Sequence, residues 1–200
     1  MAVLSDLSRR AMLRLLGAAP AAAIAPSVSA LADDRARESL KIAANAQAPA
    51  TRQVGLFSRH LQWTGVEEAI DVTRQIGFDA IEWAVRPGGH ISPERVEIDL
   101  PKVVDLTRKA GLAVPMIATA ILDAQSPHVD AILRTAHGLG IRDYRGGMFT
   151  YDYTGDLERQ LDALKPRVAS LAALNQKYGM TVAYHTHSGR GNIGGGVWDL

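Results

Sequence analysis

The chain has 200 residues, of which 47% are hydrophobic and 22% are charged, and it contains no cysteine. This is the composition of a globular protein with enough apolar material for a sizeable core. The lack of cysteine excludes disulfides and thiolate chemistry, so any metal would need His, Asp, Glu or water as ligands. Residues 1–32 hold three of the 22 basic and one of the 21 acidic side chains, which leaves the rest with a net charge of −1. A neutral body without a basic stripe argues against nucleic-acid binding.

Residues 1–32 are predicted to be an export signal. The segment SRRAMLR at 8–14 resembles a twin-arginine motif, with Met where Phe is usual and Arg where Lys is usual. An Ala- and Leu-rich stretch interrupted by Pro20 and Pro26 follows, and Ala30-Leu31-Ala32 supplies small residues for cleavage. This stretch is shorter than the roughly 20 residues that span a membrane. We expect the twin-arginine export machinery as a partner, a periplasmic or secreted location and no stable membrane span; a free amphipathic helix is the alternative.

Residues 33–51 are expected to form a linker, and from residue 52 the chain alternates between strand and helix patterns. Helical spacing of apolar residues and short Gly phrases at the helix ends distinguish the two kinds of segment. The pattern predicts strands at 54–63, 79–85, 113–122, 141–149 and 181–187, and helices at 65–78, 100–112, 127–140 and 156–179. In the first helix, Val66, Ala69, Ile70 and Ile76 are expected on one side. Such alternation indicates βαβ units around a parallel sheet.

Two α/β architectures share this pattern, a doubly wound sheet and a (β/α)₈ TIM barrel. No G-x-G-x-x-G opens the first helix, so a dinucleotide-binding fold has no support. Polar residues follow the strands at 86–90, 145–147 and 185–189, where barrels build their sites. The barrel is therefore the preferred fold. A barrel takes about 250 residues, whereas only about the first five βα units fit here, so we expect a fragment.

Three segments resemble the sugar phosphate isomerase/epimerase family of the xylose isomerase-like barrel superfamily: IEWAVRPGGHISPERVEIDLP, GIRDYRGGMFTYD and AYHTHSG with the following G and WDL. The resemblance covers residues 52–200 and implies the N-terminal part of such a barrel. It also implies a divalent metal, Mn, Co, Fe or Zn, held by a Glu at the end of strand five and by ligands from later strands. His185 stands at the place of that Glu. Either His185 replaces the carboxylate as a metal ligand, or the metal has been lost.

His185 and His187 lie two residues apart, and residues at that spacing in a strand face the same way. Neutral imidazole binds the metals named above, and His titrates near neutral pH as a general base should. We expect His185 at the metal and His187 in proton transfer. The alternative is a pair of histidines that hydrogen-bond loop carbonyls.

Glu82, Ala84 and Arg86 share one face of the strand at 79–85, and the opposite apolar face should meet the helices. Glu82 is therefore expected to be catalytic inside the barrel, with Arg86 binding a phosphate or carboxylate. An internal Glu82–Arg86 ion pair without a ligand is the alternative. The turn at 87–89 is expected to place His90 over the mouth of the barrel.

Aromatic and basic residues elsewhere complete the predicted substrate site. Tyr144 and Arg145 end the fourth strand and are expected to hydrogen-bond sugar hydroxyls, although a structural anchor is an equal alternative. Trp63 is expected to stack on a sugar ring, whereas Trp83 is expected in the core because of its strand face.

These expectations define an exported isomerase or epimerase that acts on a sugar, keto-sugar or polyol. The expected mechanism is metal-assisted proton abstraction next to a carbonyl, through an enediolate. The alternatives are an inosose-dehydratase-like lyase and a carbohydrate-binding relative without catalysis. A DNA-repair nuclease of the same superfamily is disfavoured by the export signal and the charge. An export address also makes a free sugar a better candidate than a phosphorylated one.

Overall fold

The computed structural model describes residues 52–152, 154–189 and 191–196, and the predicted signal at 1–32 and the predicted linker at 33–51 lie outside them. The described residues from 53 onward belong to one compact unit, Gln53–Leu200. Its elements in chain order are β1 (Gly55–Phe57), the 3-10 helix η1 (Ser58–Leu61), α3 (Val66–Ile76), β2 (Ala80–Val85), the 3-10 helix η2 (Pro93–Arg95), α4 (Val96–Lys109), β3 (Met116–Thr119), α5 (Val129–Gly138), β4 (Asp143–Arg145), α6 (Leu157–Tyr178) and β5 (Thr181–Ala183).

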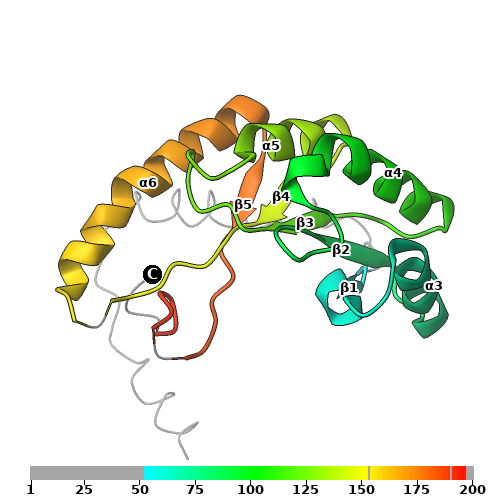
Figure 1. Ribbon diagram of the computed structural model, residues 1–200, viewed down its shortest axis with the longest axis horizontal. Coiled ribbons are helices and arrows are strands. Elements are labelled where there is room, and N and C mark those ends of the chain that lie inside the picture. Colours follow the sequence, from blue (N-terminus) through cyan, green and yellow to red (C-terminus); the bar gives the residue numbers. More distant parts are fainter. Residues whose placement is uncertain (1–51, 153, 190, 197–200) are drawn as a thin grey trace, which may run out of the picture. The chain divides into compact units, whose positions relative to one another are not determined.

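Within these residues, five strands form one parallel sheet in the order β1-β2-β3-β4-β5. The helices α3 to α6 run along one face of this sheet (Figure 1). Sequential parallel strands with helices on the outside form the wall of a (β/α)₈ barrel. The predicted fold class, a partial TIM barrel of five βα units, is confirmed.

The strands are shorter than the sequence pattern predicts. The first ends at Phe57 because the chain turns into η1, where the Ser58 hydroxyl accepts a hydrogen bond from the Ala84 backbone at 2.9 Å. The fifth strand ends at Ala183, so His185 and His187 belong to the segment that follows the sheet. Apolar alternation continues past the point where ladder hydrogen bonds stop, and periodicity alone does not mark that point.

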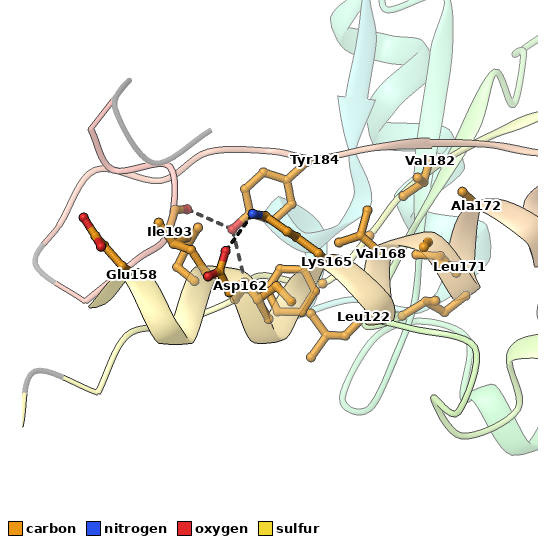
Figure 2. A pocket seen from close by; sticks show the side chains of 17 residues that line it. Leu122, Glu158, Asp162, Lys165, Val168, Leu171, Ala172, Val182, Tyr184 and Ile193 are labelled. Carbon is orange, nitrogen blue, oxygen red and sulfur yellow. Dashed lines mark hydrogen bonds and ion pairs between the residues drawn. The ribbon is translucent and has the colours of Figure 1, made fainter. Parts of the chain in front are cut away.

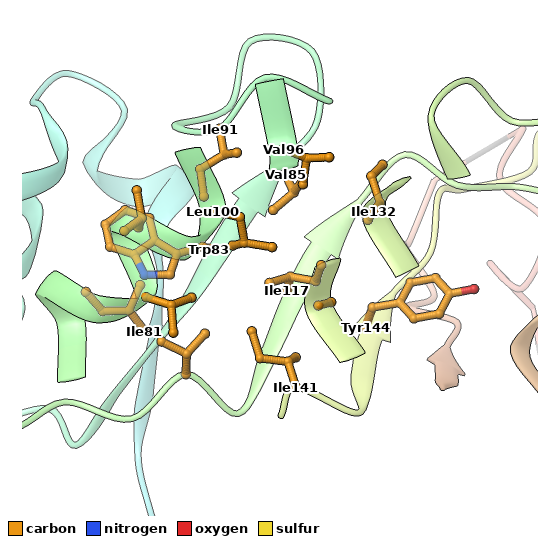
Figure 3. Close-up of a cluster of buried hydrophobic side chains, with 14 of the residues drawn as sticks. Ile81, Trp83, Val85, Ile91, Val96, Leu100, Ile117, Ile132, Ile141 and Tyr144 are labelled. Carbon is orange, nitrogen blue, oxygen red and sulfur yellow. The ribbon is translucent and has the colours of Figure 1, made fainter. Parts of the chain in front are cut away.

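The core lies between the sheet and the helices (Figure 3). Ile81, Trp83 and Val85 on β2 are almost completely buried there, as predicted from their shared strand face. The Trp83 indole donates a hydrogen bond of 3.0 Å to Thr107 on α4, so its polar atom is satisfied in the core. With β2 anchored on its outer face, the intervening residues face the opposite side of the sheet.

The helices end where the predicted Gly phrases begin. Gly77 and Gly179 follow α3 and α6 with φ angles of 93° and 60°, a conformation that glycine adopts without strain. Ile76 is 62% exposed, so the predicted buried side of α3 ends before this last residue. No helix within the described residues is long and apolar enough to cross a membrane.

Candidate active site

The candidate site is built around an ion pair between Glu82 on β2 and Arg145 on β4. The Arg145 Nε lies 3.1 Å from the Glu82 Oε1, and the two side chains are only 16% and 18% exposed. The register aligns Arg145 with Ala118 and Ala118 with Ala84, so small side chains separate the pair across β3. This spacing lets the long Arg145 side chain cross the inner face of the sheet to reach the carboxylate.

The aromatic ring of Phe57 at the end of β1 lies beneath two guanidinium groups. The Arg145 Cζ is 4.0 Å from the ring centroid and the Arg86 Cζ is 5.5 Å from it. A cation over an aromatic face is attracted by the ring quadrupole. Phe57 is in register with Glu82, so it shares the inner face. Sequence reasoning missed this residue, because its role becomes visible only when β1 is paired with β2.

Arg86 is presented by a tight turn that follows β2. Its backbone N–H donates to the Ile91 carbonyl at 3.2 Å, and the Ile91 N–H donates back to Ala84 at 3.2 Å. Gly89 closes the turn on the Arg86 carbonyl at 2.8 Å, and a Cβ at position 89 would lie 2.5 Å from the Ala84 oxygen. The ion-pair partner of Glu82 is Arg145, whereas the Glu82–Arg86 ion pair considered as the alternative does not form and the two charges interact only over a longer range.

His185 adjoins the same arginine. Its Nδ1 lies 3.1 Å from the Arg145 Nη1. A guanidinium can only donate, so Nδ1 is the acceptor and the neutral ring carries its proton on Nε2. The rings of His185 and His187 are 4.5 Å apart in an edge-to-face arrangement. The two histidines therefore meet as predicted, although they lie beyond the strand.

Burial and charge act on the ionisable groups of this cluster in different directions. Burial raises the pKa of the Glu82 carboxyl above its ordinary value, and the charges of Arg145 and Arg86 only partly offset this effect. Burial, followed by the charges of Arg145 and His187, lowers the pKa of His185. Glu82 is thereby a stronger base than an exposed glutamate, and His185 stays neutral at neutral pH.

Three residues predicted for substrate binding, Tyr144, Trp63 and His90, lie outside this cluster. Tyr144 is fully buried among the helices and donates a 2.8 Å hydrogen bond to Asn175. Adjacent strand residues face opposite sides, so Tyr144 and Arg145 do not share a site. The prediction that Tyr144 contacts sugar is wrong, and its anchor alternative is right. Burial raises the pKa of Tyr144 to about 12. Trp63 is 71% exposed in the turn after η1, and no described contact brings it to the cluster.

His90 does not overhang the mouth of the barrel, contrary to the prediction. Its ring packs edge-to-face on Trp83 at 5.3 Å and lines a hollow between the start of α3 and α4. Burial lowers the pKa of His90, while the backbone of Leu61 and Thr64 acts in the opposite direction. The turn at 87–89 directs the side chain toward the helices because Ile91 must return to pair with β2.

The described residues do not fit the predicted metal site. They contain no group of three His, Asp or Glu side chains close enough to hold an ion, and the resemblance implies that all ligands other than His185 come from later strands. His185 could ligate through Nε2 only if its proton moved to Nδ1, where it would oppose the Arg145 donor. A nearby guanidinium also repels a divalent cation.

A separate groove of about 910 Å³ lies on the outer face of β5, against the inner side of α6 (Figure 2). Its apolar wall includes Leu161, Leu164, Val168 and Leu171, which recur at helical spacing along α6. Tyr184 closes one end by donating a 2.8 Å hydrogen bond to the Ile193 carbonyl. None of the residues of the Glu82–Arg145 cluster lines this groove, so the two features are distinct.

Comparison with known proteins finds solved structures that share the barrel architecture of this chain. No protein-family model and no curated protein matches the sequence. Solved structures do match over about 70% of the chain, and at these low identities the likeness establishes the fold.

Three matches illustrate this likeness in fold. A candidate 3-DHS dehydratase, AsbF, from Bacillus anthracis is 11% identical, with a TM-score of 0.54 and coverage of 72% of this chain and 54% of that chain. The 3-keto-D-glucoside 4-epimerase YcjR from E. coli is 14% identical, with a TM-score of 0.52 and coverage of 70% and 58%. A candidate xylose isomerase from Rhodospirillum rubrum is 11% identical, with a TM-score of 0.54 and coverage of 74% and 58%. The chain thus spans a little over half the length of these structures.

Proposed function

We propose that this protein is a sugar or polyol isomerase or epimerase that abstracts a proton from the carbon next to a carbonyl. The observation that carries the proposal is the inward-facing Glu82 carboxylate, held by Arg145 and made more basic by burial. A general base works best when its pKa lies closer to the working pH than that of a free carboxylate. The epimerase and dehydratase folds described above support the same chemistry.

In the proposed reaction, Glu82 takes the proton, the electron pair of the C–H bond forms a C=C bond, and the π electrons of the carbonyl move onto its oxygen to give an enediolate. The protonated Nε2 of neutral His185 and the Arg145 guanidinium stabilise that oxygen. His187, beside His185, serves as the second group for proton transfer. Isomerisation follows when the proton returns to the former carbonyl carbon and His187 moves the hydroxyl proton from one oxygen to the other. Epimerisation follows when the original carbon is protonated on its opposite face.

No step of this mechanism runs through a divalent metal, because the Nδ1 of His185 faces the Arg145 guanidinium and its Nε2 carries the proton. Metal dependence is a prediction from the resemblance alone. Elemental analysis of the purified protein, beside a His185→Ala variant, measures it directly. Because the Nε2 of His185 carries a proton, we expect much less than one equivalent of Mn, Co, Fe or Zn in either protein.

The test of the proposed function is incorporation of deuterium from D₂O into a panel of ketoses, aldoses and keto-polyols, followed by NMR. Glu82→Gln removes the base but keeps the shape, and we expect the exchange rate to fall by about 10²–10⁴-fold. Glu67→Gln is the matched control, because Glu67 is exposed on α3 away from the site. Full exchange by the folded Glu82→Gln protein would contradict the proposal.

The products separate the two alternatives. Loss of water from a keto-polyol would indicate the dehydratase-like lyase, since the same enediolate can expel a hydroxyl group. Saturable sugar binding without any exchange would indicate a carbohydrate-binding protein. We also propose that residues 1–32 direct the protein to the periplasm or outside the cell by the twin-arginine route, on the strength of SRRAMLR and Ala30-Leu31-Ala32.

A further inference from the structure

Positive charge exceeds negative charge in the candidate site. The guanidiniums of Arg86 and Arg145 share the Phe57 ring, and Glu82 is the carboxylate that acts on both. Arg59 adds a third positive charge near Arg86. Like charges at this spacing destabilise each other unless an anion lies between them.

Two of the guanidinium nitrogens also lack a protein partner. The Nη2 atoms of Arg86 and Arg145 are buried without a hydrogen-bond acceptor among the described residues, and the neighbouring Oε1 of Glu82 is buried without a hydrogen-bond donor. Most buried polar atoms in folded proteins are paired, and an unpaired donor on a charged group costs more than a neutral one. The Glu82–Arg145 pair therefore does not use the full donor capacity of the two arginines.

Stacking on Phe57 restrains both side chains without using any of their N–H groups. An arginine presents a planar fork that fits two oxygens of one carboxylate or phosphate, and such paired bonds are about twice as strong as neutral hydrogen bonds. A neutral sugar hydroxyl accepts only a single, weaker bond of this kind. The arrangement suits an anionic oxygen group better than a hydroxyl.

We infer that the substrate carries an anionic carboxylate or phosphate group, bound by Arg86 and Arg145 over the Phe57 ring. The inference rests on the proposed function, since it names the substrate class of the same site. The substrate is then a sugar acid or a sugar phosphate, and Glu82 faces the carbon skeleton beside that group. The overall net charge of the chain, +1, does not indicate an anionic substrate, because the excess of positive charge is confined to the candidate site.

Binding of three probes tests this inference: D-glucuronate for a carboxylate, D-glucose 6-phosphate for a phosphate and D-glucose as the neutral match. We expect one of the two anions to bind at least about 10-fold more tightly than glucose. The anion that binds more tightly shows whether the site recognises a carboxylate or a phosphate. Equal affinity for glucose and both anions, or no binding of any probe, would overturn the inference.

Variants assign the binding to the arginines. Arg86→Gln should weaken binding of the preferred anion about 10-fold or more. Arg86→Lys keeps the charge but loses the planar fork of N–H groups, so its affinity should lie between those of Arg86→Gln and the unaltered protein. Arg74→Gln is the matched control, because Arg74 is exposed on α3. Thermal unfolding shows whether each variant is folded. Unchanged anion affinity in a folded Arg86→Gln protein would also overturn the inference.

The deuterium exchange experiment keeps the two proposals apart. Anion binding that depends on Arg86, without exchange at any carbon, supports the anionic site and contradicts the enzyme. Exchange in a neutral sugar, with no preference for anions, supports the enzyme and contradicts the anionic site.

Discussion

Arg145 connects the functional side chains of the candidate site. Through separate atoms it contacts the Glu82 carboxylate, the His185 ring and the face of Phe57. The position of one guanidinium thus fixes the tautomer of His185 and partly offsets the effect of burial on the pKa of Glu82. A change at Arg145 therefore alters several properties of the site at once.

The tautomer of His185 gives a direct prediction. At neutral pH we expect a neutral ring with the proton on Nε2, visible in ¹⁵N–¹H spectra of the imidazole nitrogens. Arg145→Met removes a nearby positive charge, so the pKa of His185 should rise, while burial and His187 still hold it below that of a free histidine. Arg74→Met should leave the His185 titration unchanged. A proton on Nδ1 in the unaltered protein would contradict the assignment.

Much of this site is predictable from the residues that end each strand. Glu82, Arg86, Arg145 and both histidines were expected together, because the carboxyl ends of parallel strands meet at one edge. The wrong predictions concern the side of the sheet that a side chain faces. Tyr144 stands next to an inward residue and so faces outward, and the return of the chain to β2 sets the side of His90. Local sequence does not show such pairing.

Among the elements, β4 joins the outer core to the inner site. Of its three residues, Tyr144 extends outward to Asn175 on α6 and Arg145 extends inward to Glu82. Asn175 is 5% exposed, so the hydrogen bond from Tyr144 satisfies a buried amide oxygen. The packing of α6 therefore helps to hold the backbone that presents Arg145.

Removing that hydroxyl should cost stability without removing a ligand contact. Tyr144→Phe leaves the Asn175 oxygen buried and unpaired, and we expect a loss of about 1–3 kcal/mol in the free energy of unfolding, measured in urea. Tyr178→Phe is the control, since its hydroxyl bonds an exposed Asp130, and it should cost less. Unchanged stability of Tyr144→Phe would contradict the anchoring role.

Helices were easier to predict than strands. Each helix carries an apolar face over several turns, and Gly77 and Gly179 mark two ends through their left-handed backbone. Strands of three residues hold too little pattern to define their limits. The boundary of β1 depends on the Ser58 hydroxyl meeting the Ala84 backbone, a contact between distant parts of the sequence.

At the scale of the whole molecule, the sheet order brings together residues that are far apart in sequence. Phe57, Glu82 and Arg145 come from β1, β2 and β4, and His185 comes from the segment that follows β5. All of them reach the same side of the sheet because every strand is parallel and keeps its register. The site is therefore a property of the barrel wall.

The export proposal concerns the whole chain and is tested on it. Replacing Arg9 and Arg10 together by lysine should abolish transfer to the periplasm, measured by cell fractionation in a host with a twin-arginine system. Arg14→Lys is the matched control, since the motif usually has lysine there, and it should be exported normally. Transfer of the double variant at the normal rate would contradict the twin-arginine route.

The turn that presents Arg86 has a consequence for evolution. Its hydrogen bonds join backbone atoms of Ala84, Arg86, Gly89 and Ile91, and none of them uses the side chain at position 86. Sterics require the glycine at 89, because a Cβ there would collide with the Ala84 carbonyl, and they favour the glycine at 88, whose φ is 69°. If Arg86 binds the substrate as we propose, a single codon change at position 86 alters what the barrel mouth recognises, while the backbone hydrogen bonds of the turn stay intact.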